Sequence, residues 1–226
     1  MEWKRPLQIV IYPIAANDSE VVSAYTAALS AAQFEEIATF IARESARYRL
    51  KPVPKPVFTL GETVTELPPA GPRDARGALD NLLLSLRLRH YAFRNAPFWE
   101  NIGRIRLFVV YHPAKDGEAL DHSLGLKKGL FGVVHAFASS RQNAQNNVVI
   151  THELLHTLGA SDKYDASLMP IFPEGFAEAA GEQPVYPQRA AEIMAGRIPV
   201  SPTQARIPAN LSACVIGYKT ATEINW

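Results

Sequence analysis

Hydrophobic positions in the first part of the chain switch between the period of strands and the period of helices. Residues 7–14 (LQIVIYPI) form a short β-branched run followed by the polar AANDSE, which predicts a buried strand and then a turn. Residues 57–64 (VFTLGETV), 104–112 (RIRLFVVYH) and 129–139 (GLFGVVHAFAS) are further strand candidates, and 104–112 is the clearest central strand. Four strands are therefore expected.

Helical spacing appears between these strands. A short helix is predicted around residues 21–29, and Ser30 with Gln33 forms an S-x-x-Q capping box before a longer helix over residues 31–49. The expected apolar face of this longer helix consists of Phe34, Ile37, Ile41, Ser45 and Tyr48.

A second long helix is expected after the loop ELPPAGPRD, with Asp74 as its N-cap. Its predicted core-facing residues are Leu79, Leu82, Leu83, Leu86 and His90, while Arg87, Arg89 and Arg94 are expected on the solvated side. Because parallel neighbouring strands need long crossovers, the pattern indicates an α/β fold with a mixed sheet backed by helices.

The chain changes character after Asp162. Prolines recur at positions 170, 173, 184, 187, 199, 202 and 208, and helical candidates remain only near residues 187–195 and 201–212. We therefore expect one domain over residues 1–226, in which residues 1–159 form an upper lobe with the sheet and residues 160–226 form a loop-rich lower lobe.

Composition narrows the classes of partner. The 226 residues are 47% hydrophobic, and 23 Lys and Arg against 22 Asp and Glu give a net charge of +1, so nucleic acid is not an expected partner. Cys214 is the only cysteine, which excludes an intramolecular disulfide and a cysteine-based zinc cluster. The N-terminal apolar run is shorter than a membrane span and has no cleavage pattern. For this sequence as given, a soluble, cytoplasmic chain is expected. A membrane-anchored or exported protein would require a segment that precedes it. The sequence contains no feature that indicates the oligomeric state.

Candidate chemistry is concentrated in residues 151–164, THELLHTLGASDKY. His152 and His156 are four residues apart on a predicted helix, so their imidazoles can share one Zn²⁺ at about 2.0–2.1 Å. Glu153 lies about 100° further round the helix and can reach a water on the metal without binding the metal itself. The motif thus supplies two ligands and a general base.

A catalytic zinc normally has a third protein ligand. Gly159 allows the chain to reverse after the helix, and Asp162 follows three residues later, where its carboxylate can return to the metal. The alternative third ligands are the downstream glutamates Glu174, Glu178 and Glu192, although none of them stands in a convincing second-helix motif.

The segment HELLHTLGASDKY resembles the metzincin signature H-E-x-x-H-x-x-G-x-x-H/D, in the aspartate variant of snapalysin-like proteases. The resemblance implies a metzincin-like twisted sheet, one zinc ion per chain held by His152, His156 and Asp162, and Glu153 as general base. It also implies a methionine turn beneath the metal, for which Met194 is favoured over Met169. Tyr164 and Tyr186 are candidate hydrogen-bond donors to the oxyanion that forms during hydrolysis. Most of the chain is also similar to a family of largely uncharacterised bacterial metallopeptidases, which indicates no substrate.

These features predict a zinc metallopeptidase in which Glu153 deprotonates the attacking water and returns the proton to the leaving amine. Its partner would be a peptide or protein, paired with the strand of residues 131–138, which the resemblance makes the edge strand. The alternatives are a catalytically silent peptide-binding module and a zinc amidase that acts on a non-peptide amide. His135 is expected to be structural, and His90, His112 and His122 lack ligand spacing.

Overall fold

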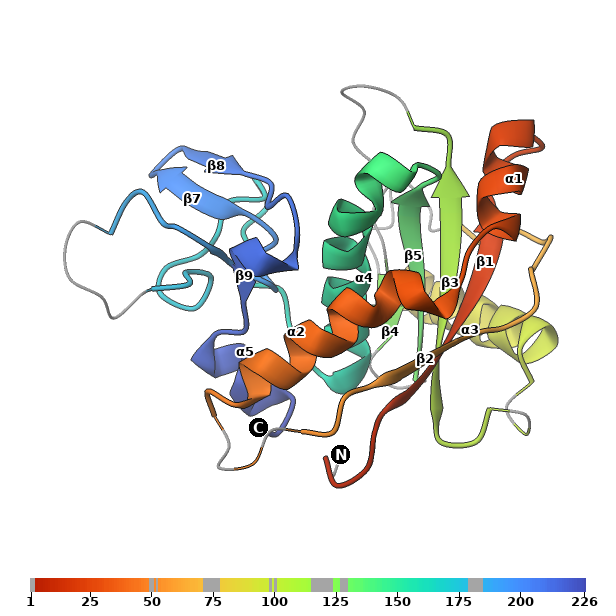
Figure 1. Ribbon diagram of the computed structural model, residues 1–226, viewed down its shortest axis with the longest axis horizontal. Helices are drawn as coiled ribbons and strands as arrows, with labels where there is room; N and C mark the ends of the chain where they lie inside the picture. Colours follow the sequence, from red (N-terminus) through yellow and green to blue (C-terminus); the bar gives the residue numbers. More distant parts are fainter. Residues whose placement is uncertain are drawn as a thin grey trace.

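A five-stranded sheet organises the first part of the chain (Figure 1). The computed structural model describes residues 3–48, 51, 53–70, 78–97, 99, 101–114, 124–126, 130–178 and 185–226. The strands follow the order β2-β1-β3-β5-β4, and the first four of these are parallel. Their bounds are β1 Gln8–Ala15, β2 Val57–Leu60, β3 Arg104–His112, β4 Leu124–Leu126 and β5 Phe131–Phe137. The prediction of a mixed α/β sheet is confirmed.

The edge of the sheet differs from the prediction. β4 pairs antiparallel with β5, with Leu124 opposite Val133 and Leu126 opposite Phe131. The expectation that residues 131–138 form the edge strand is therefore wrong, because β4 lies outside β5. A strand of only three residues, Leu-Gly-Leu, is too short to show the alternation from which strands are predicted.

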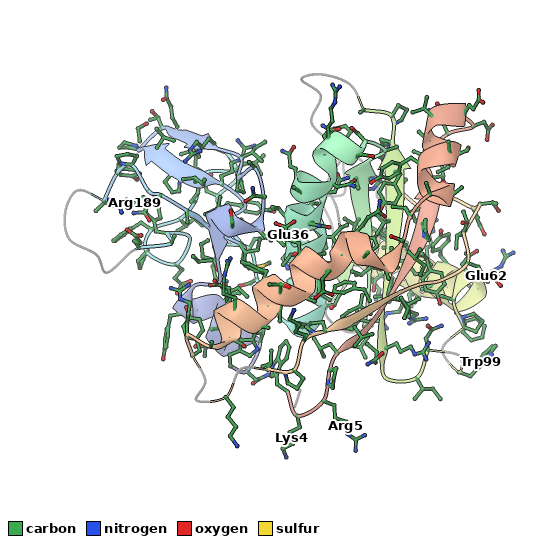
Figure 2. The ribbon with its side chains drawn as sticks, viewed as in Figure 1. Lys4, Arg5, Glu36, Glu62, Trp99 and Arg189 are labelled. Atoms are coloured by element: carbon green, nitrogen blue, oxygen red, sulfur yellow. The ribbon has the colours of Figure 1, made fainter. Side chains whose placement is uncertain are left out.

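Helices cover both faces of the sheet. On one face Ile11 and Leu107 share a core with Ile37 of α2 (Glu35–Ser45) and Leu154 of α4 (Asn143–Leu158), and α1 (Glu20–Ala27) packs beside them. The predicted capping box is present, and it caps a short 3₁₀ turn (Ala31–Phe34) that leads into α2. Glu36 of α2 accepts hydrogen bonds from Asn147 of α4 and from the amide of Leu211, and Figure 2 labels it between these elements.

The helix α3 (Ala78–Asn95) covers the opposite face of the sheet. The side of the helix that faces the sheet is not the side predicted from the sequence. Its buried residues are Leu88, Tyr91 and Ala92, which pack on the sheet residues Val10 and Phe108. The predicted core face is wrong, because His90 is exposed and Leu82, Leu83 and Leu86 are 54%, 44% and 53% exposed. Arg87, Arg89 and Arg94 face solvent as expected. Asp74 and the side chain of Leu79 lie outside the described residues.

Residues 160–178 and 185–226 form a loop-rich lobe beside α4 (Figure 1). The helices predicted at residues 187–195 and 201–212 are wrong: the first segment contains the strand β6 (Ala191–Glu192) and a turn, and the second contains Pro202, the strand β8 (Gln204–Arg206) and Pro208. The lobe instead contains short strands and turns, and its Ile193, Met194 and Ile224 join the main core. Its elements are β6 Ala191–Glu192, β7 Ile198–Ser201, β8 Gln204–Arg206, a 3₁₀ turn at Leu211–Ala213, β9 Cys214–Val215 and α5 Tyr218–Glu223.

Within the described part of the chain, no helix combines the length and the apolar character that a membrane crossing requires.

Candidate metal site

The helix α4 has one face that packs against the sheet and another that carries the histidines. Leu154 and Leu155 are fully buried in the core, which directs His152 and His156 towards the C-terminal lobe. The helix ends at Gly159, whose φ of 117° is readily adopted only by glycine. The amides of Gly159 and Ala160 both donate to the carbonyl of Leu155 at 3.0 Å and close the last turn.

The two histidines are held in one tautomer by backbone carbonyls. His152 Nδ1 lies 2.9 Å from the carbonyl of Ile193, and His156 Nδ1 lies 2.9 Å from the carbonyl of Ala160. Since a carbonyl oxygen only accepts hydrogen bonds, both Nδ1 atoms carry the proton. In the neutral rings both Nε2 lone pairs are then free, and the two Nε2 atoms lie 3.0 Å apart.

Asp162 completes a triangle of acceptor atoms. Its Oδ1 lies 3.1 Å from Nε2 of His152 and 3.1 Å from Nε2 of His156. Three acceptors at this spacing repel one another unless a cation or a proton lies between them, and tetrahedral zinc with bonds of about 2.0–2.1 Å separates its ligand atoms by about 3.3 Å. Among the described residues, these three are the one group of this kind that could hold a metal ion. The donor set fits zinc.

The charges of the three groups depend on one another. Burial acts to raise the pKa of Asp162, but the hydrogen bonds and charges of His152 and His156 outweigh it and hold that pKa far below its usual range. Burial acts to lower the pKa of His152, but the hydrogen bond to Asp162 and the charge of Glu153 outweigh it and raise that pKa above its usual value. The carboxylates of Asp162 and Glu153 therefore both favour positive charge on His152.

Glu153 lies beside this triangle and is 5% exposed. Its charge contributes to the raised pKa values of His152 and Tyr164. Glu153 is not a member of the candidate ligand set. This arrangement suits a base that acts on a water at the site.

Tyr164 also lies against the site. Its ring stacks on that of His152 with 6.4 Å between the centroids. Burial, together with the charge of Asp162 and a hydrogen bond to it, raises the pKa of Tyr164 to about 12. The phenol is therefore a hydrogen-bond donor at any physiological pH.

A turn of residues 192–196 supports the site from the C-terminal lobe. The carbonyl of Ile193 orients His152, and Met194 is fully buried, while the carbonyl of Met194 accepts from the amide of Lys163 at 3.0 Å. Glu192 holds this turn together: one of its oxygens accepts from the amides of Met194 and Ala195 at 2.7 and 3.1 Å.

The other oxygen of Glu192 accepts from the amide of Gly217 at 3.0 Å and from the hydroxyl of Thr220 at 2.7 Å. Burial outweighs these hydrogen bonds and raises the pKa of Glu192. No sequence signal predicted this role, because the donors that meet Glu192 come from separate parts of the chain.

The remaining candidates lie elsewhere. Glu192 is committed to the turn, Glu174 is exposed and 3.9 Å from Lys219, and Glu178 is exposed, so the described geometry brings Asp162 to the histidines and none of the three glutamates. Met169 lies in the loop after the site, where its carbonyl accepts from the amide of Asp165. Tyr186 packs edge-on against Phe176 with 5.5 Å between the ring centroids.

Two further histidines form a pair on the sheet. Nε2 of His112 and Nδ1 of His135 lie 2.8 Å apart at the carboxyl ends of β3 and β5. Their separation in the sequence gave no sign of this contact, which adjacent parallel strands produce. His90 is exposed on α3, and His122 lies outside the described residues.

Comparisons with known proteins do not add a name to this geometry. No protein-family model matches the chain, and no curated protein matches its sequence.

Proposed function

We propose that the protein is a zinc-dependent hydrolase that cleaves peptide bonds, a metallopeptidase of the metzincin type. The observation that carries the proposal is the convergence of His152 Nε2, His156 Nε2 and Asp162 Oδ1 within 3.0–3.1 Å of one another, beside the buried Glu153. Three protein ligands leave one zinc position for water or substrate, which is the arrangement of catalytic zinc sites and not of closed structural ones.

When bound, zinc would polarise the substrate carbonyl and lower the pKa of a coordinated water towards about 7. Glu153 would take the proton from the attacking water and deliver it to the leaving amine. Its low exposure supports this role, because burial limits competition from bulk water. The protonated Tyr164 hydroxyl is a candidate donor to the developing oxyanion.

The sheet edge favours an extended peptide as substrate. β4 is antiparallel to β5, and β5 leads through the turn Ser140–Gln142 into α4. An extended chain can add to the edge of β4 that pairs with no other described strand, through backbone hydrogen bonds that bind peptides irrespective of most side chains. We accordingly favour peptides over other amides.

A metal analysis combined with a cleavage assay tests the proposal. Protein expressed with zinc should contain about one zinc per chain, and His152→Ala and His156→Ala should lose it because too few ligands remain. The zinc-loaded protein should cleave members of a diverse peptide library, and a chelator should stop cleavage until zinc is restored. Zinc binding without cleavage of any peptide would favour a binding module, and cleavage of non-peptide amides alone would favour an amidase.

A further inference from the structure

The outward face of α3 carries an apolar stripe that the fold does not cover. Leu82, Leu86 and Phe93 are 54%, 53% and 50% exposed. Steps of four and seven residues place them on one side of the helix. Phe93 contacts Trp99 edge-on with 5.2 Å between the ring centroids, and Trp99 is itself 60% exposed. We call these four residues the α3 apolar stripe.

Arginines flank the stripe on both sides. Relative to Leu86, Arg89 lies about 60° round the helix in one direction, and Arg87 and Arg94 lie about 80–100° round in the other. All three are exposed, and none forms an ion pair with another residue in the described part of the chain. The described acidic residues nearby are Asp80 on the helix and Glu66 on the adjoining loop.

A groove beside the stripe brings two of these arginines together. A cavity of about 490 Å³ lies between α3 and the loop of residues 66–69, and its lining includes the basic side chains of Arg87, His90 and Arg94 together with one carboxylate, Glu66. Leu67, which is 50% exposed, and Leu86 line the same groove. The groove thus offers cationic donors next to apolar side chains.

We propose that this surface binds the face of an anionic lipid bilayer. An apolar stripe between Arg89 on one side and Arg87 and Arg94 on the other lets leucine and aromatic side chains enter the acyl boundary while the guanidinium groups reach lipid phosphates. Tryptophan is favoured at that depth because its ring is apolar and its N–H is polar. The paired arginines of the groove complement the negative charge of the headgroups.

The position of α3 leaves the metal site free in this arrangement. α3 packs on the face of the sheet that contains Val10 and Phe108, and α4 packs on the opposite face. Figure 2 shows Trp99 at the lower right margin of the molecule, far from Arg189 of the C-terminal lobe. A bilayer bound through α3 would therefore not cover His152 and His156.

Vesicle co-sedimentation of the whole zinc-loaded chain tests the proposal. We expect binding to vesicles of phosphatidylcholine with about a third phosphatidylglycerol, weak binding to phosphatidylcholine alone, and weaker binding at high salt. Arg87→Gln with Arg94→Gln should weaken partitioning about 25-fold, at about fivefold per cation near an anionic surface. Leu86→Ser with Phe93→Ser should abolish the shift of Trp99 fluorescence that vesicles cause in the wild type, because this variant keeps Trp99 as the reporter.

Matched substitutions outside the surface serve as controls. Arg189→Gln removes an exposed arginine and Val21→Ser removes a side chain that is 66% exposed, and both should bind vesicles like the wild type. Absence of wild-type binding to anionic vesicles would overturn the proposal, as would equal losses in the control variants. A wild-type dimer that Leu86→Ser with Phe93→Ser converts to monomers would assign the stripe to a second copy of the chain instead.

Discussion

At the scale of single residues, the decisive feature is the protonation of His152 and His156, which leaves their Nε2 atoms unprotonated where the two rings face Asp162. Carbonyls of Ile193 and Ala160 fix protons on the Nδ1 atoms, so the Nε2 lone pairs of His152 and His156 point at each other and at Asp162. Hydrogen bonds of this kind, made by the ring nitrogen that faces away from the metal, orient metal-binding histidines and increase their basicity. The side chains are thus arranged in a way that could hold a cation.

The third ligand leads to the first prediction. Asp162→Ala should weaken zinc binding by more than about 100-fold, because a ligand contributes at least as much as the residues that orient it. Competition with a chelating dye measures this change. Glu174→Ala is the matched control, since its carboxylate is exposed and 3.9 Å from Lys219, and it should bind zinc like the wild type. The reverse order would transfer the ligand role to the downstream glutamate.

This part of the site was predictable because it is local in the sequence. The spacing from His152 to His156 and the glycine before Asp162 predicted these three residues as candidate ligands, and the structure brings their side chains together. The contribution of Glu192 was not predictable, because its partners at Met194, Gly217 and Thr220 meet only in the folded chain.

At the scale of elements, the hydrophobic periodicity identified the four parallel strands, but it did not identify β4 or the buried face of α3. β4 has too few residues for a pattern, and α3 is apolar on two sides, so its spacing selects the exposed leucines as readily as Leu88 and Tyr91. Burial within the fold decides between the two faces of α3. The proline-rich lobe has no period, and its two predicted helices are accordingly wrong.

The end of α4 gives the second prediction. Gly159→Ala introduces a Cβ at a φ of 117°, which costs on the order of 1–2 kcal/mol and disturbs the path to Asp162. We expect a lower melting temperature and weaker zinc binding in the same variant. Gly103→Ala is a suitable control, because Gly103 also has positive φ, 72°, but lies in the turn before β3. It should lower the melting temperature and leave the zinc affinity unchanged.

The turn of residues 192–196 gives the third prediction. One carboxylate oxygen of Glu192 accepts from the amides of the turn, and the other accepts from Gly217 and Thr220. Glu192→Gln places an amide NH₂, which is itself a donor, against one of these two pairs of donors, so the turn and the Ile193 carbonyl should shift. Zinc affinity should fall about 10–100-fold, the usual range for a residue behind a ligand.

Glu44→Gln is the control for Glu192→Gln. Glu44 is equally buried and accepts from the amide of Ile216 and from Arg47, but it makes no hydrogen bond to the turn. It should lower the melting temperature without a comparable loss of zinc. Equal zinc affinities of both variants would show that Glu192 supports the fold and not the site.

At the scale of the whole molecule, the site joins two parts of the chain. His152 and His156 come from α4, whereas Asp162 and the turn of residues 192–196 belong to the lobe beside it (Figure 1). A metal that binds only the folded state stabilises it by about 2.7 kcal/mol when its concentration is 100 times the Kd. Metal removal should therefore loosen the lobe together with the site.

Thermal unfolding measures this linkage and gives the fourth prediction. A chelator should lower the melting temperature of the zinc-loaded protein by roughly 5–10 °C, from about 2–4 °C per kcal/mol for a chain of this size. His156→Ala should melt at the same temperature with and without the chelator. An identical melting temperature for metal-loaded and metal-free wild type would show that no metal couples α4 to the lobe.

The most direct test of the proposed peptidase activity is the cleavage rate of Glu153→Gln. Glutamine preserves the size of the side chain but cannot accept the proton of the attacking water, so fold and zinc content should remain. With a peptide that the wild type cleaves, and at equal zinc occupancy, the rate should fall by about two to four orders of magnitude. Cleavage at the wild-type rate by Glu153→Gln would contradict the proposed mechanism.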